Sequence, residues 1–137
     1  MDEKEGQLFI ENEIRNFVKD NPLNRMPDDA GQPIFEEPLI GFADAADPLF
    51  TAYKTIIAPT HLTPREALAL ALNKTPEELP AKLTTISWIL PVAAKTRQSN
   101  RVEKTTPSRL WANTRWYGEK FNETLRTHLV KKLVDKG

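Results

Sequence analysis

The stretch LTTISWILPV, residues 83–92, constrains the fold of this chain more than any other. It is rich in β-branched residues and almost continuously apolar, which is typical of a strand buried on both faces of a sheet. We therefore expect it to lie centrally in a sheet, with helices on either side. A shorter apolar stretch, PLIGFA at residues 38–43, is bounded by proline and aspartate and predicts a second buried strand.

Capping signals followed by proline predict several helix starts. Asp47 precedes Pro48 and Thr63 precedes Pro64, so each cap residue stands before a proline at the first helical position, where a missing N–H costs nothing. Glu66, three residues after Thr63, completes a capping box. These signals predict helices over residues 48–57 and 64–73, and a related signal predicts a single turn over residues 76–79.

Apolar residues at helical spacing predict a first helix over residues 5–20 and a last helix that ends near Gly137. Residues 21–33 contain three prolines and a glycine, so we expect an exposed connection there. Residues 92–107 read as a long polar loop. The fold class expected from this order is α/β or α+β, with a small sheet flanked by helices.

The 137 residues suit a single domain, in which residues 1–37 form a helix and proline-rich loop extension. Two strands make only a marginal sheet on their own. In α/β proteins a glycine after a helix usually introduces another strand, and Gly137 has this position. We therefore expect the chain to be the incomplete N-terminal part of a larger protein.

The composition excludes several kinds of site. The chain has no cysteine, which excludes disulfides, thiolate zinc sites, a cysteine nucleophile and an iron–sulfur cluster bound in the usual way within it. His61 and His128 are its two histidines, and we interpret each as a surface or satisfied side chain. No catalytic residue and no metal ligand is predicted. No apolar run is long enough to span a membrane and the start MDEKEG is acidic, so we expect a cytoplasmic protein.

The charges are distributed unevenly along the chain. Residues 1–50 hold 12 acidic and 4 basic side chains, whereas residues 51–137 hold 7 acidic and 15 basic ones. The basic residues are concentrated between Lys95 and Lys120. This basic segment could bind phosphates or an anionic cofactor, or it could neutralise the acidic half of its own fold.

The basic segment also carries aromatic residues. Trp111, Trp116 and Tyr117 could stack on a flat ligand or on single-stranded nucleic acid, while Arg109 and Arg115 hold an anionic group. The alternative is that the aromatic residues anchor a loop to the core and the arginines lie over them.

Residues 38–136 also carry a resemblance to a known family. The stretch TTISWILPV, a polar loop and then SRLWANTRWYGEKFNETLRTHLVKKL resemble a segment of the epoxyqueuosine reductase-like iron–sulfur protein family, as a divergent branch. Ile86, Leu90 and Pro91 match the family's strand, and LIGFADAADPLF is similar to its early strand. Trp111–Ala112 stands where Tyr-Ala is usual. Trp116–Tyr117–Gly118 replaces Asp-Tyr-His, so the histidine of that motif is absent. The helix positions that match are Phe121, Leu125, Arg126 and Leu129.

The resemblance implies a cobalamin-binding α/β domain followed by a ferredoxin-like domain with two 4Fe–4S clusters. This chain would then be the N-terminal cofactor- or substrate-binding domain of a reductase, inactive without the downstream ferredoxin-like domain or another electron-transfer partner. An exposed sheet edge would favour a homodimer. The residues expected to line the cofactor cleft are Arg97, Arg101, Arg109, Trp111, Arg115, Trp116 and Tyr117. The alternative function is a non-enzymatic binding module that uses residues 95–120 to hold nucleic acid or an acidic partner protein.

Overall fold

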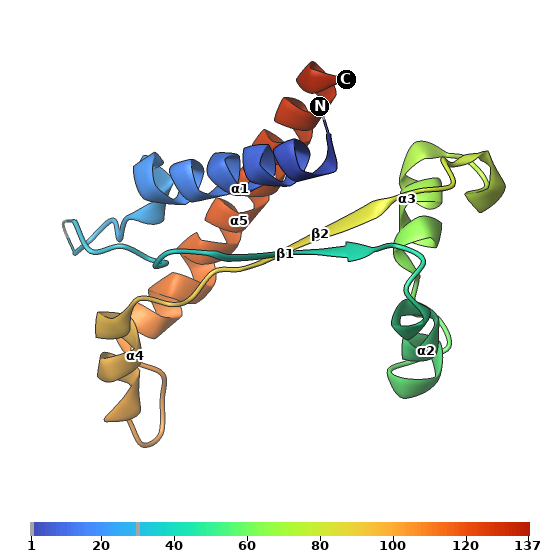
Figure 1. Cartoon of the computed structure of the whole chain (residues 1–137). Coiled ribbons are helices and arrows are strands. Elements are labelled where there is room, and N and C mark those ends of the chain that lie inside the picture. Colours follow the sequence, from blue (N-terminus) through green and yellow to red (C-terminus); the bar gives the residue numbers. More distant parts are fainter. Residues whose placement is uncertain (1, 30) are drawn as a thin grey trace. The chain divides into compact units, whose positions relative to one another are not determined.

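The computed structural model describes residues 2–29 and 31–137. These residues form an α+β fold with five helices and a two-stranded antiparallel sheet (Figure 1). The helices are α1 (Glu3–Asp20), α2 (Pro48–Ile56), α3 (Pro64–Leu72), α4 (Ala94–Arg101) and α5 (Arg109–Lys136). The strands are β1 (Leu39–Asp44) and β2 (Thr84–Ile89), and two short 3-10 helices cover Pro22–Asn24 and Pro76–Glu78.

The chain divides into two compact units. The terminal unit contains Met1–Leu39 and Trp88–Gly137, and the middle unit contains Ile40–Ser87. No helix of the described residues is long and apolar enough to cross a membrane.

The core of the terminal unit lies where α1 packs on α5. Ile14 and Val18 on α1 and Phe121 and Leu125 on α5 are buried, and the ring of Phe17 lies 5.5 Å from that of Phe121. The helix α1 begins two residues earlier than the apolar spacing predicts. The reason is a capping box, in which the Asp2 carboxylate accepts a hydrogen bond from the Glu5 N–H.

The connection after α1 is not exposed throughout, so that expectation was wrong. Asn24 and Met26 are buried. The Asn24 side-chain amide donates to the Val18 and Phe35 carbonyls at 2.8 and 3.0 Å, and its oxygen accepts from the Phe35 N–H at 2.9 Å. A single asparagine side chain therefore provides hydrogen-bond partners for three backbone groups, at the end of α1 and at Phe35.

The strands occur where the apolar stretches predict them, but neither is buried on both faces. The side chain of Ile89 is 64% exposed, and β1 is half-buried or exposed along its length. Burial on both faces requires other elements packed against each face of a sheet, and the exposed residues of both strands show that this sheet lacks such cover.

Two segments expected to be loops are helical. The polar stretch after β2 contains α4, whose first N–H, that of Ala94, donates to the Glu36 carboxylate at 2.6 Å. The aromatic and cationic segment forms the first turns of α5, which begins after Ser108; the Ser108 hydroxyl accepts from the Trp111 N–H at 3.2 Å. Ser108 is an N-cap of the usual kind.

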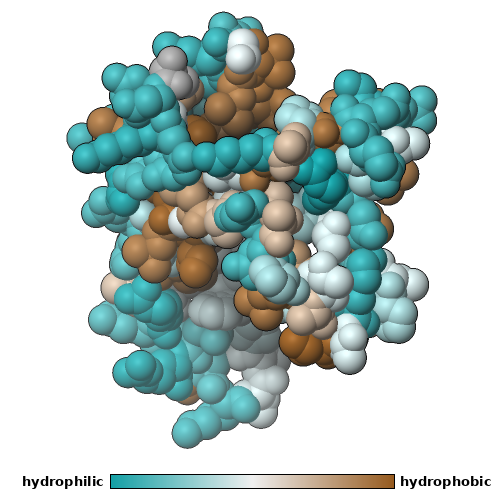
Figure 2. All heavy atoms as spheres, turned by 45° about the vertical axis from the view of Figure 1, so that its right-hand side comes forward, coloured by the Kyte–Doolittle hydropathy of each residue, from teal (hydrophilic) through white to brown (hydrophobic). Residues whose placement is uncertain are grey.

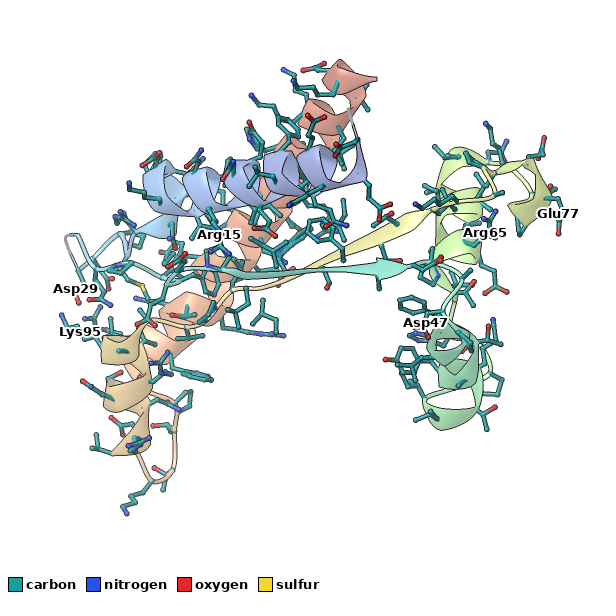
Figure 3. The ribbon with its side chains drawn as sticks, in the orientation of Figure 1. Arg15, Asp29, Asp47, Arg65, Glu77 and Lys95 are labelled. Carbon is teal, nitrogen blue, oxygen red and sulfur yellow. The ribbon has the colours of Figure 1, made fainter. Side chains whose placement is uncertain are left out.

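The middle unit confirms the predicted caps. Asp47 accepts from the Leu49 N–H at 2.8 Å, and Thr63 and Glu66 form the reciprocal capping box. Arg65 on α3 reaches across to the Pro76, Pro80 and Ala81 carbonyls and so fixes the segment that carries Glu77 (Figure 3).

Few large apolar side chains of the middle unit are buried. Leu79 is buried together with two alanines, whereas large side chains on and after its helices, among them Ile56, Ile57 and Leu70, are exposed. Figure 2 shows hydrophobic patches, in brown, scattered among the hydrophilic side chains of the face in view.

The capping box of α3 predicts a pH-dependent stability. The Thr63 N–H, followed by the Lys54 ammonium, holds the pKa of Glu66 below its ordinary value of 4.5. The carboxylate therefore stabilises the fold at neutral pH, and this contribution disappears as the pH falls through the lowered pKa. In urea titrations between pH 3 and 6, we expect Glu66→Gln to be less stable than wild type near pH 6, and this difference in the free energy of unfolding to shrink as the pH falls below 4.5. The control Glu77→Gln changes an exposed carboxylate, so its free energy of unfolding should depend on pH as that of wild type does. If the free energy of unfolding of Glu66→Gln also differed from that of wild type by a constant amount at every pH, the lowered pKa of Glu66 would be refuted.

Candidate ligand-binding cavity

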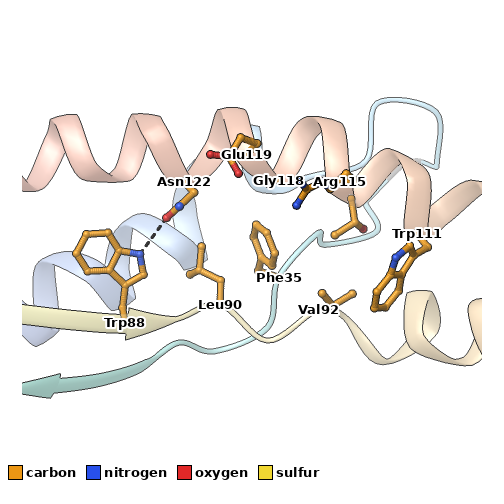
Figure 4. Close-up of a pocket in the computed structure, with 10 residues that line it drawn as sticks. Phe35, Trp88, Leu90, Val92, Trp111, Arg115, Gly118, Glu119 and Asn122 are labelled. Atoms are coloured by element: carbon orange, nitrogen blue, oxygen red, sulfur yellow. Dashed lines mark hydrogen bonds between the residues drawn. The ribbon is translucent and has the colours of Figure 1, made fainter. Parts of the chain in front are cut away.

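A cavity of about 390 Å³ lies in the terminal unit, between α5 and the segments around Phe35 and Leu90 (Figure 4). Five of its ten lining residues are aromatic or aliphatic, and four have polar or charged side chains. The lining residues are Phe35, Trp88, Leu90, Val92, Trp111, Thr114, Arg115, Gly118, Glu119 and Asn122.

The floor of the cavity is a short antiparallel ribbon. Phe35 pairs with Val92, the Glu36 N–H donates to the Pro91 carbonyl at 2.8 Å, and the Ala93 N–H donates to the Ile34 carbonyl at 3.0 Å. Successive side chains along each strand of such a ribbon point to opposite faces, so every second side chain faces the same way. This explains how a ribbon with few residues presents several apolar groups to α5.

The opposite wall is one face of α5. Residues that line the cavity recur along α5 at steps of three or four, and residues at these spacings share a helix face. They are Trp111, then Thr114 or Arg115, then Gly118, and then Asn122. The same spacing is present in the sequence, but it indicates a shared face only where the segment is helical. A segment interpreted as a loop gives no such indication.

Gly118 allows the ribbon to approach the helix closely. A Cβ atom at this position would lie 2.6 Å from the Phe35 ring, a separation that side chains do not tolerate. The absence of a side chain at Gly118 therefore sets how far Phe35 reaches toward α5, and with it one boundary of the cavity.

The polar groups of the cavity come mostly from α5. The Trp88 indole N–H donates to the Asn122 oxygen at 3.0 Å, which holds that indole at one end of the cavity (Figure 4). Thr114 is only 7% exposed, and its hydroxyl has no hydrogen-bond partner among the described residues. Arg115 and Glu119 are exposed, and neither forms an ion pair with another described residue.

Of the seven residues expected in the cleft, Trp111 and Arg115 line this cavity. Trp116 is 76% exposed and does not line this cavity; it lines a second, open hollow on α5, to which Arg115 and Glu119 also contribute. Tyr117 packs against a buried cluster that contains Met26, Ile34 and Leu110.

The remaining three arginines have other positions. Arg109 pairs with Asp28, and Arg97 pairs with Glu36 at 3.4 Å and donates to the Val92 carbonyl. Arg101 is exposed on α4 and forms no ion pair within the described part of the chain. The proposed common cleft of seven residues is thus distributed over several surfaces, and its role in binding stays a prediction.

The basic segment is partly neutralised by the acidic start of the chain. The Lys95 ammonium lies 2.8 Å from an Asp29 carboxylate oxygen (Figure 3). Two further ion pairs of the same kind join Arg97 to Glu36 and Arg109 to Asp28. These contacts favour the interpretation of the charge asymmetry as complementarity within one unit. They leave fewer cations available to a phosphate backbone.

Sequence reasoning missed most of the cavity. Phe35 belongs to a segment interpreted as an extension, and Trp88, Leu90 and Val92 were interpreted as parts of a buried strand and the loop after it. The helical residues Thr114, Gly118, Glu119 and Asn122 carried no separate signal, because a site built on one face of a helix is recognised only once the helix is known to start at Arg109.

No metal centre can be assembled from the residues that the structure describes. The sequence has no cysteine, and within residues 2–29 and 31–137 no group of three or more histidine, aspartate or glutamate side chains gathers at one place. No family model, no curated protein and no solved structure matches this chain.

Proposed function

We propose that the terminal unit is a small-molecule binding module whose cavity holds a flat apolar ligand with an acidic group. The observation that carries this proposal is the lining of the cavity: two tryptophans and a phenylalanine surround it, and a cationic side chain, Arg115, stands at its edge.

The size and lining of the cavity agree with such a ligand. Small-molecule sites usually measure about 300–1,000 Å³ and combine apolar walls with a few polar groups. At about 390 Å³ this cavity suits a ligand of one or two rings. Trp88 and Trp111 offer faces for stacking, and aromatic pairs of this kind contribute about 0.5–1.5 kcal/mol beyond the area they bury.

Arg115 supplies the preference for an acid. A guanidinium binds a carboxylate or phosphate through two parallel hydrogen bonds. Arg97 and Arg109 already have carboxylate partners in the same unit, whereas Arg115 has none among the described residues. An anionic ligand in the cavity would give it one.

The same unit supports part of the role implied by the family resemblance. Leu90 and Trp111, which carry that resemblance, both line the cavity, so we propose that it is the substrate-binding part of a reductase-like protein. The cofactors of that family fit less well. No cysteine is present to ligate a 4Fe–4S cluster, and a cavity of about 390 Å³ is too small to enclose a whole corrin ring with its side chains.

A calorimetric titration with 3-(2-naphthyl)propionate tests the proposal. We expect this acid to bind at least tenfold more tightly than the neutral 3-(2-naphthyl)propanamide, because the carboxylate gains a charge-assisted hydrogen bond. Arg115→Gln should remove most of that difference. The matched control Arg101→Gln, on the exposed surface of α4, should retain it.

Two outcomes would contradict the proposal. Equal affinity of the acid and the amide for wild type would show that Arg115 does not select an acid. Tight, steeply salt-dependent binding of single-stranded nucleic acid, with a log–log slope of about −0.7 per contacted phosphate, would instead support the alternative binding module.

A further inference from the structure

We propose that the ligand of the cavity is a zwitterion of the α-amino acid type, with an aromatic or large apolar side chain. This inference rests on the proposed function and specifies its ligand: a basic group stands beside the acid, and the two are recognised by neighbouring side chains of α5.

Arg115 and Glu119 are the two charged side chains of the lining. They stand one helical turn apart, and side chains at this spacing are close neighbours on a helix surface. Both line the cavity, yet neither is engaged in an ion pair with any described residue. A guanidinium and a carboxylate one turn apart are complementary to the carboxylate and ammonium that an amino acid carries on a single carbon.

The charged side chains of the lining all come from α5, which also contributes Trp111, whereas the other side of the cavity contributes Phe35, Trp88, Leu90 and Val92. Figure 4 shows Arg115, Glu119 and Asn122 on α5, opposite Leu90 and Val92 on the ribbon. A ligand that satisfies both walls has a charged head on one side and an apolar body on the other. An amino acid with a ring side chain has this distribution.

The hydroxyl of Thr114 is buried beside these charges without a hydrogen-bond partner among the described residues. A threonine inside a helix commonly donates to the carbonyl four residues earlier. Thr124 and Thr127 of the same helix do so, at 2.8 and 3.0 Å. Thr114 has no such partner among the described residues although it is buried and lines the cavity. A ligand carboxylate held by Arg115, one residue further along α5, would accept its hydrogen bond.

The inference is tested with three compounds that share one ring system. They are 3-(2-naphthyl)-L-alanine, 3-(2-naphthyl)propionate, which lacks the ammonium, and 2-(2-naphthyl)ethylamine, which lacks the carboxylate. A zwitterion loses more hydration on binding than either analogue, so it binds best only where both charges find partners. We expect the amino acid to bind at least tenfold more tightly than each of the other two in calorimetric titrations.

The variant Glu119→Gln separates the two charges. It should weaken binding of the amino acid about tenfold, while the affinity for 3-(2-naphthyl)propionate stays within twofold of wild type. The control Glu123→Gln lies one turn further along α5, outside the cavity, and should leave both affinities unchanged.

The possible results distinguish this inference from the proposed function. If the propionate binds as tightly as the amino acid, the zwitterion inference is wrong but the proposal of an acidic flat ligand stands. If the ethylamine binds most tightly, both are wrong. Failure of all three compounds to bind at millimolar concentration would also overturn both.

Discussion

Replacing Phe121 by alanine is expected to lower the free energy of unfolding of the terminal unit by about 3–5 kcal/mol, the range found for truncation of buried aromatic side chains. Phe121 is 0% exposed, and its ring lies 5.5 Å from that of Phe17 and 5.9 Å from that of Phe35. The variant leaves a void where α1, α5 and the floor of the cavity meet. Urea denaturation followed by tryptophan fluorescence measures the effect.

A control on the same helix makes this result interpretable. Val134 is 73% exposed on α5, and Val134→Ala should change the free energy of unfolding by less than about 0.5 kcal/mol. If Phe121→Ala lowered the free energy of unfolding by less than about 1 kcal/mol, α1 and α5 would not share the core described above.

Replacing Gly118 by alanine is expected to lower the free energy of unfolding by about 1–3 kcal/mol and to abolish ligand binding. The added Cβ atom would lie 2.6 Å from the Phe35 ring, so the ring must move and change the floor of the cavity. Helix propensity alone predicts the opposite sign, because alanine is better than glycine inside a helix by about 1 kcal/mol. The sign of the effect therefore tests the close approach directly.

Gly6 offers the matched control for this substitution. It lies inside α1, and a Cβ atom there would meet nothing within 4 Å apart from its chain neighbours and the backbone of its own helix. Gly6→Ala should therefore raise the free energy of unfolding by about 0.5–1 kcal/mol. If both alanine variants were equally stabilised, the contact between Phe35 and Gly118 would be refuted.

The sequence predicted those features that depend on near neighbours in the chain. The starts of α2 and α3 follow from Asp47 and Thr63, whose side chains bond backbone groups two or three residues away. The strands β1 and β2 follow from short apolar stretches. Features that depend on residues so close together in the chain can be predicted without the tertiary structure.

The missed features depend on contacts between distant segments. The helix α4 has no apolar stripe, and its first N–H is satisfied by Glu36, 58 residues earlier. The burial of Asn24 is determined by its bonds to Val18 and Phe35. The candidate cavity was found only in part for the same reason: Trp111 and Arg115 stand out by residue type, whereas Gly118 and Phe35 acquire meaning through their contact with each other.

The presence of a flat acidic ligand in the cavity between α5 and the ribbon can be tested with the indole N–H signals in a nitrogen–proton correlation spectrum. Trp88 and Trp111 line the cavity, whereas Trp116 does not, although it lines a neighbouring hollow together with Arg115 and Glu119. On titration with 3-(2-naphthyl)propionate, we expect the signals of Trp88 and Trp111 to shift together and saturate, and to shift further than that of Trp116. A shift confined to Trp116, or no shift of any of the three at millimolar ligand, would contradict it.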